Sequence, residues 1–177
     1  MKVSDNHMTY EIHPDVCAGT VARDEALPCP IMQMNQVHDV KVAVVDKVDI
    51  PQDELDGSDA IVTDLPGVAI GVRTADCIPV LLYDPVKKAV AAIHSGWKGT
   101  GSKIISKTVA KMRTAYSSQP SDLLAFIGPG ICMDCFQVGE EVALKFKEAG
   151  FDIDSLWAFR GPKTGNGMEG GHHIDLK

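Results

Sequence analysis

The sequence predicts an α+β fold with mixed β-sheets and helices packed on the outer faces of those sheets. Candidate strands outnumber candidate helices, and the order of strands and helices is irregular. Regular alternation of the two is typical of doubly wound nucleotide-binding folds, so its absence favours α+β. With 177 residues, 45% of them hydrophobic, the chain can bury one sizeable core. Residues 1–177 are therefore predicted to form a single domain.

Seven short runs of apolar and β-branched residues are predicted to be strands, because Gly, Pro or Asp bounds each of them. In chain order they cover residues 31–37, 40–48, 60–63, 68–74, 78–83, 88–94 and 123–127. Pro79 lacks a backbone N–H, so the run at 78–83 should begin at a sheet edge or an irregularity.

Two segments carry apolar residues at the spacing of one helix face. The first contains Ile104, Ile105, Thr108, Val109 and Met112, and the second contains Val138, Val142, Phe146 and Ala149. Gly150 follows the second segment and predicts a C-terminal stop there. The glycine-rich segment at 161–173, GPKTGNGMEGGHH, is expected to be mobile.

Charge and hydropathy exclude several classes of partner. The formal net charge of −7 argues against nucleic acid, whose binding usually needs a basic face. The N-terminal residues MKVSDNHMTYEI lack the apolar core of a signal peptide, and no apolar run is long enough to span a bilayer. The chain is therefore predicted to be soluble and cytoplasmic, without a membrane partner.

Five cysteines, an odd number in a chain without an export signal, argue against a disulfide framework. Cys132 and Cys135 form a lone C-x-x-C, which suits a redox pair or half of a zinc site. No second C-x-x-C completes a structural zinc site, and the zinc-deaminase context is absent. Buried or incidental thiols are the favoured interpretation of this pair.

The stretch IHSGWKGTGSK at 93–103 resembles a nucleotide-binding loop at first sight. A Walker loop needs Gly-Lys-Ser/Thr, whereas Gly101 is followed by Ser102 and Lys103, and the glycine spacing also fails the dinucleotide fingerprint. A helix opening near Ser102 would still offer unpaired N–H groups to an anion. An ordinary strand-to-helix turn is the alternative.

Three polar residues with metal-binding side chains stand at the ends of apolar runs: His38, Cys77 and His94. Loops that follow rigid strands commonly present catalytic groups. Taken singly, His38 reads as a surface histidine, Cys77 as a small buried hydrophobe and His94 as a packed strand end. Together they supply two imidazoles and a thiolate, which zinc prefers, and leave a fourth position open. Their spacing matches no local zinc motif, so both interpretations stay open on the residues alone.

Four blocks of sequence resemble, in the right order, the laccase-domain family, also called the multicopper polyphenol oxidoreductase or YfiH-type family. They are NQVHDVKV, DGSDAIVTDLPGVAIGVRTADCIPVLLYDP, IHSGWKGT and IGPGICMDCFQVGEEV, which lie within residues 31–142. The resemblance implies a YfiH-like fold, similar to the deamidase domain of cytotoxic necrotizing factors. It also implies that His38, Cys77 and His94 bind zinc and that the turn after the strand presents His94.

The chain departs from the family pattern at both ends. GTVAR, which ends at Arg23, leads almost directly into LPCPIMQMNQVH, where the family carries a glycine-rich segment. HHIDLK resembles the family's Asp-Leu element, but the tail expected after it is absent. The domain is therefore predicted to be incomplete at the C-terminus and in the N-terminal Gly-rich segment.

The resemblance implies a zinc-dependent purine nucleoside phosphorylase with adenosine deaminase side activity. Its partners would be a purine nucleoside and phosphate, and zinc lowers the pKa of a bound water to about 7. Lys98 and Arg73, near the expected helix start, are the candidates for binding phosphate, and Arg23 is a further substrate-binding candidate. Asp76 would act with the three metal ligands, by orienting a ligand or moving a proton, unless it only caps a turn.

Two other activities remain open on the sequence. Cys77 would serve as a nucleophile activated by His94 in a cysteine hydrolase or deamidase. Copper-dependent phenol oxidation ranks lower, because multicopper chemistry needs more histidines than the six present. A non-enzymatic interaction domain is the third class, although all three metal-binding residues are retained. The preferred nucleoside, the balance between phosphorolysis and deamination, and the oligomeric state are not determined by the sequence.

Overall fold

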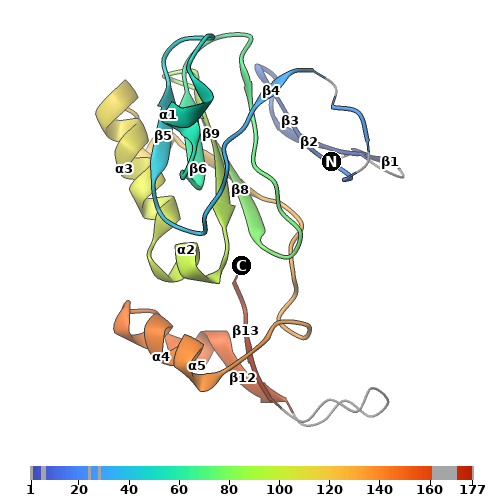
Figure 1. The fold of residues 1–177 in the computed structure, drawn as a ribbon, viewed down its shortest axis with the longest axis vertical. Helices are drawn as coiled ribbons and strands as arrows, with labels where there is room; N and C mark the ends of the chain where they lie inside the picture. Colours follow the sequence, from blue (N-terminus) through green and yellow to red (C-terminus); the bar gives the residue numbers. More distant parts are fainter. Residues whose placement is uncertain (1, 5–6, 24, 28, 161–170, 177) are drawn as a thin grey trace.

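A five-stranded mixed sheet forms the centre of the computed structural model, which describes residues 2–4, 7–23, 25–27, 29–160 and 171–176 (Figure 1). The strand order is β10 (Leu124–Ile127), β8 (Ile78–Asp84), β9 (Ala89–Ser95), β6 (Ala60–Thr63) and β5 (Val42–Val45). All neighbours are antiparallel except β5 and β6, which run parallel. These mixed sheets with associated helices confirm the predicted α+β class.

Both faces of β6, β8 and β9 are largely buried, because these strands are apolar at nearly every position, whereas the edge strand β10 is mostly exposed. Odd residues of β9 and even residues of β6 and β8 join the core beneath α3 (Ile104–Tyr116), with Ile104 and Met112 fully buried. The alternate residues Ile61 and Ala92 face the other way and pack with Met34 and Leu55. The period-2 alternation therefore supplies two cores, one on each side of the sheet.

The opposite face of the sheet is covered by irregular segments and short elements. These are α1 (Gln52–Leu55) and the parallel pair β4 (Ile31–Met32) and β7 (Ala69–Ile70). The predicted strands at 31–37, 40–48 and 68–74 are therefore too long, since residues 33–37 and 71–74 are irregular. The runs at 60–63, 78–83, 88–94 and 123–127 agree with the observed strands to within one residue.

Both predicted helices form, and the second ends where the sequence indicates. α4 spans Glu140–Glu148, and Gly150 follows it with φ +81°. The N–H of Gly150 donates to Lys147 O and that of Phe151 to Phe146 O, which is the hydrogen-bond pattern of a Schellman motif. The Phe146 and Phe151 rings pack 5.1 Å apart, centroid to centroid. The first helix is preceded by a separate short helix, α2 (Trp97–Gly101).

Two small sheets were not predicted. At the N-terminus β1 (Lys2–Ser4), β2 (His7–His13) and β3 (Val16–Val21) form an antiparallel meander beside the central sheet (Figure 1). Near the C-terminus β11 (Gln137–Val138), β13 (Gly171–Ile174) and β12 (Trp157–Arg160) form another, next to α4 and α5 (Ile153–Leu156). Residues 171–173 of the segment expected to be mobile thus belong to a strand, and residues 161–170 lie outside the described part.

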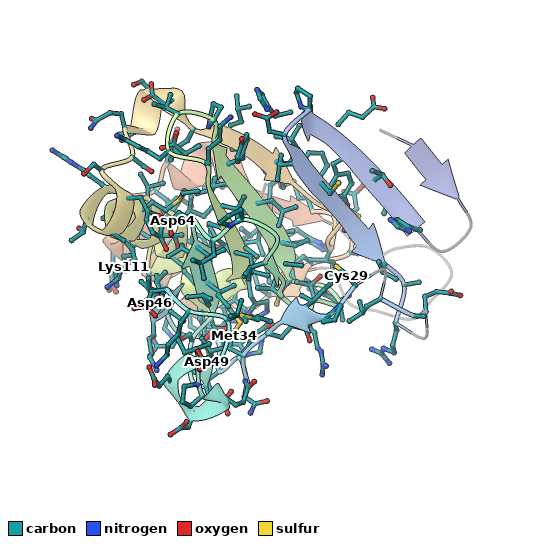
Figure 2. The ribbon with its side chains drawn as sticks, turned by 90° about the horizontal axis from the view of Figure 1, so that it is seen from above. Cys29, Met34, Asp46, Asp49, Asp64 and Lys111 are labelled. Carbon is teal, nitrogen blue, oxygen red and sulfur yellow. The ribbon has the colours of Figure 1, made fainter. Side chains whose placement is uncertain are left out.

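Acidic residues mark the end of the sheet where the parallel strands finish. Asp46 and Asp64 directly follow β5 and β6, and both side chains are labelled in Figure 2. Burial, followed by the charges of Asp64 and Asp46, raises the pKa of Tyr116 to about 12.

None of the helices in the described residues is both long and apolar enough to cross a bilayer.

The turn between β8 and β9 is held by a buried carboxylate, and we therefore expect the protein to lose stability in acid. Asp84 is fully buried and its Oδ1 accepts from the N–H groups of Val86 and Lys87, both at 2.9 Å. Burial alone raises the pKa of this carboxyl, but its hydrogen bonds bring the pKa below the ordinary 3.8. The ionised Asp84 therefore makes its full contribution to the free energy of unfolding above the ordinary pKa of 3.8. That contribution is lost as the pH falls through the lower pKa of Asp84 in the folded protein.

We expect Asp84→Asn to lower the free energy of unfolding at pH 7 by about 1 kcal/mol, because the two bonds lose their charge assistance. The variant should then lose less stability than the wild type when the pH falls below 4. Urea unfolding at a series of pH values measures both effects. Parallel pH profiles for the two proteins would refute this role of Asp84.

Candidate metal centre

The sheet topology brings three distant residues to one end of the sheet. His38 lies in the loop before β5, Cys77 directly precedes β8, and His94 is the penultimate residue of β9. β8 and β9 are antiparallel with Pro79 opposite His94, so the start of one strand meets the end of the other. One ligand atom from each of the three side chains lies within 4.8 Å of the other two. The predicted candidates are therefore brought together.

A buried carboxylate, Asp59, holds this end of the sheet together. Its Oδ1 accepts from the His38 N–H at 2.9 Å and from His94 Nδ1 at 2.7 Å. Its Oδ2 accepts from the N–H groups of Val37 at 3.1 Å and Asp39 at 2.8 Å. Burial alone raises the pKa of Asp59, but these four hydrogen bonds bring it below its ordinary value. The carboxylate therefore stays ionised and connects the loop to the strand.

The two imidazoles are held in different ways. His94 is buried, and its Nδ1–H bond to Asp59 leaves Nε2 available to a metal or substrate. His38 is exposed and takes a left-handed backbone conformation with φ +61°, in which its N–H reaches Asp59. Histidine is one of the few residue types enriched in that conformation. The ring centroids lie 4.7 Å apart at 80°, so the rings meet edge to face.

The thiol of Cys77 is half-buried between these rings and the start of α2. Burial, followed by the negative charges of Asp76 and Asp59, raises the pKa of this thiol. The thiol therefore keeps its proton at neutral pH in the metal-free protein. Binding of a cation would displace that proton and give a thiolate ligand.

Gly96 leaves room for the two side chains that it adjoins. A Cβ atom at this position would lie 2.9 Å from Cys77 Sγ and 3.3 Å from His38 Cδ2. A Cβ at Gly101, also in the α2 region, would meet only the Phe146 ring at 3.7 Å or more, which is ordinary contact. The glycine of the Gly-Trp pair therefore has a steric role in the site.

We expect Gly96→Ala to lower affinity for a divalent metal about tenfold or more, because either the sulfur or the ring must move from its ligand position. Isothermal titration with zinc measures the affinity, and thermal unfolding reports the fold. Gly101→Ala is the matched control and should bind zinc as the wild type does. Equal affinity of both variants would show that Gly96 does not shape the site.

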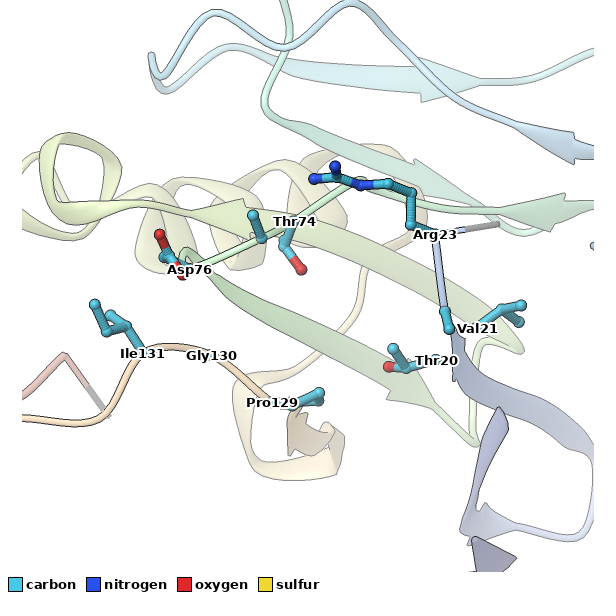
Figure 3. A pocket seen from close by; sticks show the side chains of 10 residues that line it. Thr20, Val21, Arg23, Thr74, Asp76, Pro129, Gly130 and Ile131 are labelled. Atoms are coloured by element: carbon cyan, nitrogen blue, oxygen red, sulfur yellow. The ribbon is translucent and has the colours of Figure 1, made fainter. Parts of the chain in front are cut away.

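A pocket of about 370 Å³ opens beside Asp76, the neighbour of Cys77 (Figure 3). The end of β3, the segment before β8 and the loop after β10 line it, with residues Thr20–Arg23, Thr74–Asp76 and Pro129–Ile131. Figure 3 shows the Arg23 and Asp76 side chains among the residues that line the pocket. Its volume lies within the range of small-molecule sites. Two of the predicted site residues, Arg23 and Asp76, thus share one cavity.

The two residues predicted to bind phosphate lie elsewhere. Arg73 is held by glutamines, since its Nε donates to Gln33 Oε1 at 2.9 Å and its backbone pairs with the Gln36 side chain. Lys98 is exposed on α2, with its ammonium 5.7 Å from the centroid of the Trp97 ring. Neither residue lines the pocket described above. Their role in binding phosphate stays a prediction.

The donor set fits a transition metal. Two imidazoles and one thiol, as at this site, suit zinc and also copper. Within the described residues, one such group of three or more potential ligands is found. Asp59, which orients His94, was not among the predicted site residues. An acidic residue just before a buried strand was the only sequence signal for it.

Comparison with known proteins gives consistent results. The family described as multi-copper polyphenol oxidoreductase laccase matches residues 17–177. Adenosine deaminase RL5 from an unknown prokaryotic organism is 40% identical over 153 residues, which are 83% of this chain and 56% of that protein. A purine nucleoside phosphorylase of Bacteroides thetaiotaomicron is 42% identical over 125 residues, 71% of this chain and 44% of that protein.

A solved structure supports the same assignment. The crystal structure of the Bacillus licheniformis hypothetical protein YfiH matches with a TM-score of 0.69 and 27% identity, covering 81% of this chain and 55% of that one. The chain thus spans about half the length of the relatives that it matches.

Proposed function

The chain belongs to the multi-copper polyphenol oxidoreductase laccase family, and from this premise we propose that it is a zinc-dependent purine nucleoside phosphorylase with adenosine deaminase side activity. The convergence of His38, Cys77 and His94 beside a pocket of suitable size carries the proposal. The relatives named purine nucleoside phosphorylase and adenosine deaminase support the substrate class.

The residues of the chain would divide the work between binding and proton transfer. The pocket lined by Arg23 and Asp76 would take the nucleoside, with the guanidinium pairing an anionic or hydroxyl oxygen. Phosphate would attack the anomeric carbon of the sugar while the bond to the purine breaks. The departing purine would take up a proton brought by dihydrogen phosphate, and the Asp76 carboxylate would relay that proton or orient the purine. His38, Cys77 and His94 do not line the pocket themselves, but Cys77 follows Asp76 directly. These three residues would hold zinc, which would supply a Lewis acid.

We expect release of free purine from adenosine or inosine to depend on phosphate. Chromatography of the products with and without phosphate measures this, and sugar 1-phosphate should accumulate with the purine. Conversion of adenosine to inosine should not need phosphate, because water is then the second reactant. Equal purine release in both buffers would exclude phosphorolysis.

A second candidate, a cysteine hydrolase or deamidase, is favoured by one observation. Asp59, His94 and Cys77 lie in the order carboxylate, imidazole, thiol, as in an activated cysteine nucleophile. The raised pKa of Cys77 opposes it, since reactive thiols usually have lowered values. Hydrolysis of an ester or amide by metal-stripped protein would support the hydrolase. Loss of all activity on stripping, with recovery on adding zinc, would support the phosphorylase.

Copper-dependent phenol oxidation is a third candidate, which rests on the family description alone. The donor set does not distinguish copper from zinc. Elemental analysis of the purified protein, followed by activity measurements after reloading with each metal, would decide between the two ions.

A further inference from the structure

The loop after β10 carries two exposed thiols on one tight turn. The N–H groups of Cys135 and Phe136 both donate to the carbonyl of Cys132 at 3.0 Å, which closes a turn over residues 132–136. These cysteines were predicted to be buried or incidental thiols, and their exposure rules out burial. An exposed pair in this arrangement is open to reagents in solution.

We propose that Cys132 and Cys135 are a reversible dithiol–disulfide site, oxidised by small-molecule disulfides, that changes the rigidity of the loop bracing Cys77. The turn satisfies the main steric requirement. Residues i and i+3 of a hydrogen-bonded β-turn have Cα atoms less than about 7 Å apart, which overlaps the range that disulfides span. The backbone therefore needs little rearrangement to bridge the pair.

The two thiols are also unequal in acidity. A side-chain hydrogen bond from Cys135, followed by the N–H groups of Cys135 and Asp134, lowers the pKa of the Cys132 thiol, against the opposing charge of Asp134. The thiolate is the reactive form in thiol–disulfide exchange, so Cys132 is the attacking residue and Cys135 the resolving one. This division of roles can be tested by replacing each cysteine singly with serine.

The turn is connected directly to the candidate metal centre. The N–H of Ile131, next to Cys132, donates to the Asp76 carbonyl at 2.8 Å. A Cβ atom at Gly130 would lie 3.2 Å from the Cys77 carbonyl and 2.4 Å from Ile78, so the loop backbone packs closely against that segment. Gly130 and Ile131 also line the pocket. A change in the turn is therefore transmitted to the residues on either side of Cys77.

The other side of the turn is anchored to the C-terminal sheet. His173 of β13 is buried, and its Nδ1–H donates to the Met133 carbonyl at 2.9 Å. β13 pairs with β11, which follows the turn, with Gln137 opposite His173. The turn is therefore held at both ends, and closing a disulfide across it would restrict the motion that remains.

The chemistry is a two-electron exchange. The Cys132 thiolate attacks one sulfur of the oxidant, whose S–S bond breaks, and releases one thiolate. Cys135 loses its proton to solvent, attacks the Cys132 sulfur of the mixed disulfide and releases the second thiolate. The protein pair is oxidised to a disulfide and the oxidant is reduced to two thiols, which take up protons according to the pH.

Glutathione mixtures of increasing oxidised fraction, followed by acid quenching, alkylation and tryptic mass spectrometry, test the first part of the proposal. Cleavage after Lys and Arg places Cys132 and Cys135 alone in peptide 114–145, Cys17 in 3–23, Cys29 in 24–41 and Cys77 in 74–87. The exposed Cys17 and Cys29 are thus internal controls. Peptide 114–145 should gain an internal disulfide at an oxidised fraction about tenfold or more below that which modifies the controls, because its second thiol is intramolecular.

The single variants test the assigned roles. Cys135→Ser should leave Cys132 trapped as a mixed disulfide with glutathione, whereas Cys132→Ser should leave Cys135 as slow to react as Cys17. Two glutathiones on peptide 114–145, or no modification where the controls react, would overturn the proposal. Both serine variants should fold, since the side chains that they replace are exposed.

Amide hydrogen exchange, read by NMR, tests the connection to the pocket without any activity assay. The Ile131 amide should exchange about tenfold more slowly in the disulfide form, because the cross-link restricts local opening. The Gly57 amide, which donates to Asn35 O at 2.9 Å in another loop, should not change. Equal exchange of Ile131 in both forms would refute the link to Cys77. These measurements do not depend on the reaction proposed above.

Discussion

Replacing Cys77 with alanine is expected to abolish stoichiometric zinc binding and to lower phosphate-dependent purine release at least about 100-fold. The substitution removes the thiol that groups with His38 and His94 and leaves two imidazoles, which are too few for a stable site. Elemental analysis and product chromatography on the same preparation measure both quantities. The wild type should contain about one zinc per chain.

Two comparisons make this result specific. Cys29→Ala removes an exposed thiol outside the site and should retain both zinc and activity. Thermal unfolding should show that Cys77→Ala is folded, since the half-buried thiol makes few of the core contacts. Zinc bound at full occupancy in Cys77→Ala would refute the assigned ligand set. Loss of zinc with activity retained would instead refute the dependence of the reaction on the metal.

Replacing Asp59 with asparagine is expected to have the largest effect on stability, about 2–4 kcal/mol, and to weaken zinc binding about 10–100-fold. Each carboxylate oxygen accepts from two donors, so neither orientation of an amide avoids placing its NH₂ group against two N–H donors. The His38 loop would then separate from His94, and the ring of His94 would lose the partner that fixes its tautomer.

Urea unfolding and zinc titration separate the two effects of this variant. Asp56→Asn is a matched control, because Asp56 accepts from Asn35 and Gln52 away from the site. Some loss of stability is expected there, but zinc affinity should stay within about twofold of the wild type. If Asp59→Asn loses stability but binds zinc normally, Asp59 is a structural residue and does not position the ligands.

The central sheet was predictable because its strands are apolar on both faces. β6 was predicted with its observed bounds, since polar Asp59 and Asp64 flank four buried residues. Residues 33–37, QMNQV, contain three amide side chains, and this segment bonds to groups outside a sheet. The Val37 N–H donates to Asp59, and the Gln36 side chain pairs with the backbone of Arg73. The strand propensity of single residues carries no information about these long-range hydrogen bonds, so the strand predicted over residues 31–37 was too long.

The site was predictable in its members but not in its assembly. His38, Cys77 and His94 each stand at the end of an apolar run of the sequence, and this placement made them candidates. Their convergence depends on the register of β8 against β9, which residue spacing does not fix. The N-terminal meander was missed for a related reason, since β2 buries Tyr10 but exposes or half-buries its other described side chains, which gives a weak alternation.

Asp59 connects the His38 loop to β9 through protein atoms alone, and this has a consequence for how the ion would arrive and leave. Small zinc domains such as zinc fingers are held together by their ion and unfold when it is removed. In this chain, folding alone brings His38, Cys77 and His94 together. The conformational entropy is therefore lost on folding and not on binding of the ion. A chelator should therefore withdraw zinc from a chain that remains native, and the emptied protein should accept another divalent ion without refolding.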